Sequence, residues 1–156
     1  MVRRAAIDQK FNHEEMLDET AREILSIKEY KLLPDEELAD FIQGMSSSIK
    51  LALIKKGIDP EIFVEDPEWT VRLAVAQKGI ICPQFVEDPK AEIRAEMARR
   101  SYCLEKLSKD SDDSVLIEVI RAGYGLNKFI LSRKKHIREE VVKYIKNEID
   151  TALKKK

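Results

Sequence analysis

Histidine and cysteine, the side chains best suited to metal binding or nucleophilic chemistry, are scarce in this chain of 156 residues. His13 and His136 lie far apart, and no Glu-x-x-His or His-x-x-x-His pair places two metal ligands on one helix face. Cys82 and Cys103 lack the spacing of zinc ligands, and no base is placed beside either thiol to activate it. The sequence therefore predicts two reduced thiols, no catalytic residue, no metal and no cofactor.

Basic side chains are a second chemical candidate, because six of them occupy equivalent places along the chain. These candidate binding residues are Lys55, Lys56, Lys78, Arg99, Arg100 and Arg121. Aligned along one edge of a fold, they could follow a phosphate backbone or an acidic stretch of a partner protein. If they end helices, however, the helix dipole accounts for them without a ligand. The formal net charge is −1 overall, but −5 in residues 1–48 and +7 in residues 121–156.

Aromatic side chains give a third candidate. Trp69, the only tryptophan, falls in an expected loop between two units. An exposed tryptophan there would anchor a partner, whereas a covered one would pack on the edge of the fold. Tyr102 and Tyr124 share a column with Ile58 and Ile80, so we expect both tyrosines to pack in the core.

The elements that must position these side chains follow from a 22-residue repeat. The pentapeptide Phe-Val-Glu-Asp-Pro at residues 63–67 recurs unchanged at residues 85–89. Apolar residues extend this period over five units, in three columns. The columns are Ile49, Val71, Ile93, Val115 and Ile137; Leu53, Val75, Met97, Val119 and Val141; and Ile54, Ala76, Ala98, Ile120 and Val142.

Each unit has the pattern of two short helices. The first covers about eight residues with one buried apolar stripe, and we expect these helices to start near residues 49, 71, 93, 115 and 137. Pro60 and Pro83 suit the first turn of a second helix, which is short enough to be a 3₁₀ turn.

Residues at the helix ends support this pattern. Polar side chains stand where a helix start needs a cap, at Ser48, Thr70, Ser114 and, in the same column, His136. Glycines stand where a left-handed residue ends a helix, at Gly57, Gly79 and Gly123.

Two-turn helices are unstable alone, so the units must stack and bury their stripes against one another. We expect an all-α domain with an N-terminal helical cap (residues 1–48, with one long helix over 12–33), four repeats (49–136), and a closing helix with a basic tail (137–156). The closing helix has one apolar stripe, at Ile137, Val141, Ile145, Ile149 and Leu153. Near-complete burial is expected for Val75, Phe85, Met97 and Val119.

The segment Asp-Pro-Glu-Trp-Thr-Val-Arg-Leu-Ala-Val-Ala at residues 66–76 resembles the signature of HEAT-like repeats. The short unit, with Glu-Asp-Pro at 87–89 followed by Ile93, Arg94 and Ala98, resembles the leucine-rich-repeat variant more closely. The resemblance covers about residues 49–145 and implies a right-handed superhelix of paired helices, α with α or 3₁₀. It fades where Leu116 replaces the arginine and Ser132 the aspartate.

The same resemblance implies a structural ladder, in which an aspartate of one unit bonds an arginine or a backbone amide nearby. Asp66 with Arg72, and Asp88 with Arg94, have the spacing of such a ladder. A charged ligand groove is the functional alternative, but partly buried charges need partners, which favours the structural interpretation.

The functional prediction is a non-enzymatic module that binds an unknown protein or peptide. The alternative is a nucleic-acid-binding protein that uses the basic edge. A more remote one is a DNA glycosylase made of HEAT-like repeats, which relies on an aromatic and an acidic residue, of which Trp69 near Asp66 is a superficial echo. No apolar run is long enough to span a bilayer and no signal peptide is evident, so the protein is expected to be cytoplasmic, with no membrane partner and no small-molecule substrate.

Overall fold

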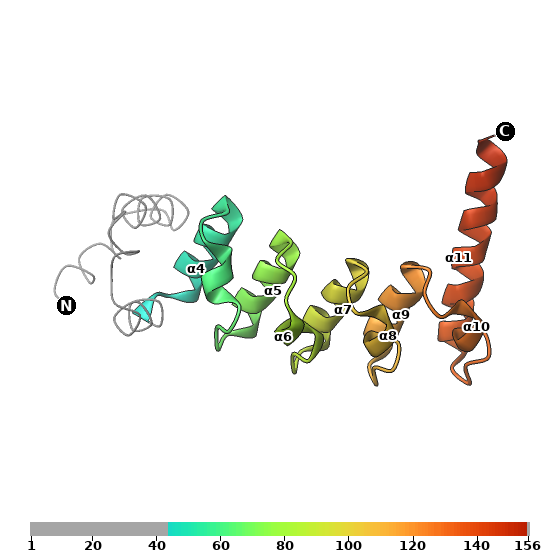
Figure 1. Cartoon of the computed structure of the whole chain (residues 1–156), viewed down its shortest axis with the longest axis horizontal. Coiled ribbons are helices and arrows are strands. Elements are labelled where there is room, and N and C mark those ends of the chain that lie inside the picture. The colour runs from blue at the N-terminus through green and yellow to red at the C-terminus, as the bar shows by residue number, and fades with distance from the viewer. Residues whose placement is uncertain (1–43, 156) are drawn as a thin grey trace. The chain divides into compact units, whose positions relative to one another are not determined.

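The computed structural model describes residues 44–155, and within that range every regular element is a helix (Figure 1). The all-α prediction is therefore confirmed for the described part of the chain. The expected N-terminal cap, including the helix over residues 12–33, lies almost wholly outside it. The described chain divides into two compact units, one ending at Lys78 and the other beginning at Gly79.

The first unit contains two α-helices joined by a 3₁₀ turn. Its elements are α4 (Ser47–Lys56), η2 (Pro60–Phe63) and α5 (Trp69–Lys78). α4 packs against α5, and η2 contacts both. The short second helix predicted to begin at Pro60 is thus confirmed as a 3₁₀ turn.

The second unit alternates four-residue helices with longer ones. Its elements are α6 (Pro83–Val86), α7 (Ala91–Arg99), α8 (Leu104–Leu107), α9 (Asp113–Arg121), α10 (Leu126–Phe129) and α11 (Lys135–Lys154). α7 packs against α9, and α9 packs against α11. The three longer helices of this unit therefore pack against one another in chain order.

The five longer helices begin at residues 47, 69, 91, 113 and 135, so their starts recur every 22 residues. The predicted period is confirmed, although each helix begins two residues earlier than expected. The expectation placed the start at the first apolar column, whereas the helix already exists over the two residues before that column, none of which is buried.

This shift corrects the predicted caps. Ser48, Thr70 and Ser114 lie inside the first helical turn rather than before it. The Ser46 side chain caps α4 by accepting the amide of Ile49, and Asp112 caps α9 by accepting the amide of Ser114. Lys90 and Lys134, which precede α7 and α11, make no side-chain cap.

The predicted helix ends are confirmed, because the backbone turns left-handed after each of three helices. Gly57, Gly79 and Gly123 have φ values of 76°, 106° and 78°. After α7 the equivalent residue is Ser101, which adopts φ 59° although it carries a side chain. This conformation is strained for an L-residue other than glycine.

The core lies where the repeat predicts it. Val75, Phe85, Met97 and Val119 are all fully buried, as expected. The tyrosines are not core residues, because Tyr102 is half-buried and Tyr124 is exposed. Each follows the left-handed residue, and the chain is already leaving the helix there; the Tyr124 amide bonds back to the Val119 carbonyl.

The apolar stripe of α11 is only half covered. Ile137 and Val141 are fully buried, but Ile145, Ile149 and Leu153 are 42%, 54% and 65% exposed. The adjacent Val142 is 57% exposed. α11 has 20 residues, whereas α9, on which it packs, has nine, so α11 runs on past its neighbour (Figure 1). The distal part of the closing stripe is therefore an open face.

Candidate functional site

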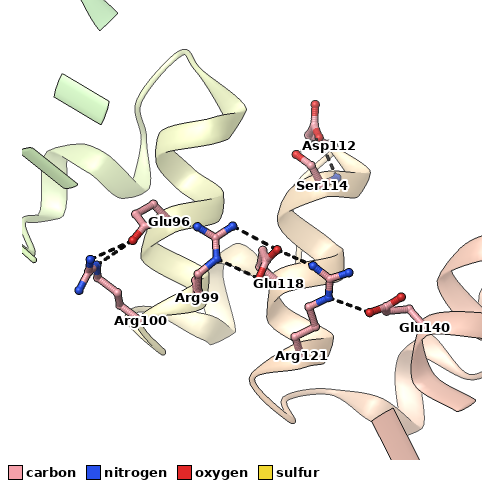
Figure 2. A network of polar contacts seen from close by, with 8 residues as sticks. All are labelled: Glu96, Arg99, Arg100, Asp112, Ser114, Glu118, Arg121 and Glu140. Atoms are coloured by element: carbon pink, nitrogen blue, oxygen red, sulfur yellow. Dashed lines mark hydrogen bonds and ion pairs between the residues drawn. The ribbon is translucent and has the colours of Figure 1, made fainter. Parts of the chain in front are cut away.

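In the second unit, the basic column is formed by three arginines near the ends of two helices. Arg99 and Arg100 end α7, and Arg121 ends α9. Figure 2 shows that their guanidinium groups point toward glutamates of their own helix or of the next one. This arrangement decides whether the column is available to a ligand.

Glu96, Glu118 and Glu140 neutralise these arginines in a continuous network. Glu96 pairs with Arg99 and, at 3.0 Å, with Arg100. Glu118 accepts from Arg99 at 3.2 Å and from Arg121 at 2.9 Å, and Arg121 reaches Glu140 at 2.7 Å (Figure 2). The sequence analysis missed these glutamates, although they too recur every 22 residues.

The network fixes the arginines as structural cations. The hydrogen bond to Glu118 raises the pKa of Arg99, and the hydrogen bond to Glu140 raises the pKa of Arg121. Glu96 and Glu118 are themselves buried. A phosphate group would have to compete with carboxylates already in place, so this column is poorly suited to polyanions.

In the first unit, the predicted basic residues lie at the carboxyl ends of α4 and α5. Lys55 and Lys56 are exposed in the last turn of α4. The Nζ atom of Lys78 donates to the Lys55 carbonyl at 2.8 Å. Lys78 thereby caps the end of α4, where the helix dipole favours a cation.

Trp69 is the first residue of α5 rather than part of a loop. The expected loop position is corrected for the same reason as the caps, since the helix starts before the first buried column. The Trp69 side chain is half-buried. This position favours packing along the edge of the unit over an exposed anchor.

The predicted contacts between Asp66 and Arg72, and between Asp88 and Arg94, are made by a backbone oxygen instead of the carboxylate. Arg72 Nη1 donates to the Asp66 carbonyl, and Arg94 Nη1 to the Asp88 carbonyl, each at 2.7 Å. The carboxylates accept amides two residues ahead: Asp66 from Glu68 and Asp88 from Lys90, each at 2.9 Å. The arginines therefore brace the Asp-Pro turn.

The ladder itself connects residues 16 positions apart, which the sequence analysis did not foresee. Lys50 Nζ lies 2.6 Å from an Asp66 oxygen, and both side chains are almost completely buried. Arg94 donates two hydrogen bonds to the Asp110 carboxylate, from Nε at 2.7 Å and from Nη2 at 2.9 Å. Each ion pair joins the longer helix of a repeat to the turn that ends the same repeat.

Pairing shifts the pKa values of Arg94 and Asp110 in opposite directions. Burial by itself would raise the pKa of Asp110, but hydrogen bonds from Arg94 and the backbone amides of Asp112 and Ser111 outweigh it and lower that pKa. The hydrogen bond to Asp110 raises the pKa of Arg94. Both groups are thus held in their charged forms.

Histidine and cysteine were the first chemical candidates in the sequence, and the structure places His136, Cys82 and Cys103. Within residues 44–155, no three histidine, cysteine or acidic side chains gather closely enough to hold a metal ion. No disulfide joins Cys82 and Cys103. His136 lies in the first turn of α11 and contacts Asp113 of α9 at 2.8 Å, so it bridges two helices rather than capping one.

In the described chain, no helix combines the length and apolar character needed to cross a membrane. Comparison with known proteins found no matching family model, no matching curated protein and no matching solved structure.

Proposed function

We propose that this chain is a non-enzymatic module that binds a protein or peptide, and that its binding surface is the open face of α11. The observation that carries the proposal is the exposure of Val142, Ile145, Ile149 and Leu153 along one helix. Exposed apolar residues scattered singly need no explanation, but a contiguous row of them marks an interaction site.

A HEAT-like solenoid is the proposed architecture. The 22-residue recurrence of helix starts supports it, as does the packing of α7 on α9 and of α9 on α11. Solenoids of stacked helices bind partners on their extended surfaces, and their end units need caps to shield apolar side chains from water. A partner protein that binds the open face of α11 would shield these apolar side chains from water.

The polar contacts weaken the two alternatives. The arginines suited to a phosphate backbone are already paired with glutamates. Asp66, the acidic residue that a glycosylase interpretation needs, is buried and paired with Lys50. We also propose a cytoplasmic location, which two cysteines without a disulfide between them favour.

Affinity capture with a matched pair of variants tests the proposal. The wild-type chain, Ile149→Lys and the control Leu131→Lys would each be incubated with cell extract, since both residues are exposed and apolar. We expect a protein that the wild type and the control retain and Ile149→Lys loses, and that binds again after purification. Salt-sensitive binding of nucleic acid near physiological ionic strength, without such a protein, would overturn the proposal.

A further inference from the structure

Arg138 of α11 is held in the same way as Arg94 of α7. Arg94 Nη1 donates to the carbonyls of Asp88 and Pro89, at 2.7 and 3.3 Å. Arg138 Nη1 donates to the equivalent carbonyls of Ser132 and Arg133, at 2.6 and 3.1 Å. The two guanidinium groups therefore have equivalent backbone anchors, two repeats apart.

The other edge of the guanidinium group distinguishes the two arginines. Arg94 donates hydrogen bonds from Nε and Nη2 to the carboxylate of Asp110, which lies 16 residues further along the chain. Arg138 is half-buried, and its Nε and Nη2 atoms bond to no group in the described chain. Sixteen residues beyond Arg138 the chain has Lys154, a cation, so the repeat itself supplies no carboxylate at this place.

Neighbouring residues of α11 also lack the contacts that their equivalents in α7 and α9 make within the described chain. Arg99 and Arg121 reach glutamates of the next helix, whereas the equivalent Lys143 is exposed with no ion pair in the described part of the chain. Ile120, buried in α9, corresponds to the exposed Val142. Within the described chain, α11 thus has unpaired cations and an exposed apolar residue at positions where α7 and α9 contact later parts of the chain.

We propose that this surface binds an amphipathic helix of a partner protein that carries carboxylates beside its apolar stripe. This inference rests on the proposed function and specifies the partner's chemistry. The apolar stripe lies on Val142, Ile149 and Leu153, whose spacings of seven and four place them on one helix face. One carboxylate takes the two open donors of Arg138, as Asp110 does for Arg94, and another pairs with Lys143.

Charge argues for a partner protein over a second copy of α11. The open part of α11 carries Lys143, Lys146, Lys154 and Lys155 against Glu148 and Asp150. A second α11 would bring a further excess of lysines to this face. Like charges brought together at an interface oppose binding, whereas opposite charges favour it.

Two synthetic peptides test the inference by fluorescence anisotropy. Each has three heptads with leucine at the core positions; one carries glutamate at the flanking positions and the other glutamine. We expect the glutamate peptide to bind the full chain with a Kd on the order of 10 μM, and the glutamine peptide at least about tenfold more weakly. The tenfold ratio reports the carboxylates alone, because the apolar stripes are identical.

Variants locate the peptide on α11. Ile149→Lys should abolish binding of both peptides, whereas Leu131→Lys should not. Lys143→Glu should weaken the glutamate peptide about threefold or more and leave the glutamine peptide unchanged, whereas Lys109→Glu, the same charge change outside α11, should have little effect. All four side chains are exposed, so the substitutions do not disturb the core.

Three results would overturn the inference. Equal binding of both peptides would remove the role of carboxylates but leave the proposed function standing. Binding of neither peptide would exclude an acidic amphipathic helix as the ligand, while the capture experiment decides separately whether a protein partner exists. Self-association of the wild-type chain in sedimentation, lost in Ile149→Lys, would assign the face to a second copy.

Discussion

Arg94 and Arg138 occupy the same position of the repeat, yet only Arg94 forms an ion pair in the described chain. Both brace the preceding turn through Nη1, but only Arg94 has a carboxylate on its second edge, from Asp110. The surrounding apolar positions differ in the same way, since Ile120 of α9 is buried and Val142 of α11 is exposed. Among the described helices, α9 and α10 pack on α11 and none packs beside its distal half, which leaves the distal positions of α11 exposed.

The largest expected effect separates the buried core from exposed apolar residues. Phe85→Ala should lower the free energy of unfolding by about 3–5 kcal/mol, because the site is fully buried and cannot readily collapse. Leu131→Ala, at a side chain that is almost fully exposed, should change it by less than about 0.5 kcal/mol. Urea unfolding measures both. A small loss for Phe85→Ala would show that this part of the core is misplaced.

The next effect compares the two arginines directly. Arg94→Ala strands the carboxylate of Asp110, so it should cost about 1–3 kcal/mol after allowance for partial solvent screening. Arg138→Ala strands no carboxylate and should cost less than about 1 kcal/mol. Equal losses in urea unfolding would mean that the Arg94–Asp110 pair contributes nothing beyond the bracing of the turn.

The sequence revealed the period, the helices and the core columns, because apolar spacing within a helix reflects which face is buried. The partners of the charged residues were harder to foresee. Asp110 meets Arg94 because the chain after α8 folds back on α7 within one repeat, whereas the short spacing of Asp88 and Arg94 predicts a contact between those two side chains instead. The open face of α11 could not be predicted either, because periodicity shows that Ile149 lies on an apolar face but not whether another helix covers it.

Acidification provides a smaller test of the same pair. The folded-state pKa of Asp110 lies below its ordinary value of 3.8, so its contribution to stability is present above that pH and is lost as pH falls through the lowered pKa. Stability of the wild type should therefore fall below about pH 4. Thermal unfolding of Arg94→Ala should show a shallower fall over the same range. Parallel curves would contradict this role for Asp110.

The smallest effect concerns the ends of α7 and α9. Ser101→Gly should stabilise the protein by about 0.5–1 kcal/mol, because φ 59° strains any residue with a Cβ atom. Gly123→Ala should do the opposite, since its Cβ would lie 2.5 Å from Tyr144 Oη. Thermal unfolding measures both shifts. A destabilising Ser101→Gly would show that the serine side chain makes a contribution larger than its strain.

Amide hydrogen exchange along α11 tests most directly whether this helix has an open face. In the isolated chain, the amides of residues 145–154 should exchange much faster than those of 139–144, because the distal segment lacks covering contacts. Adding the glutamate peptide should slow exchange over residues 142–154 while leaving α7 unchanged. Strong protection of residues 145–154 in the isolated chain would contradict the account, because it would mean that the face is already covered.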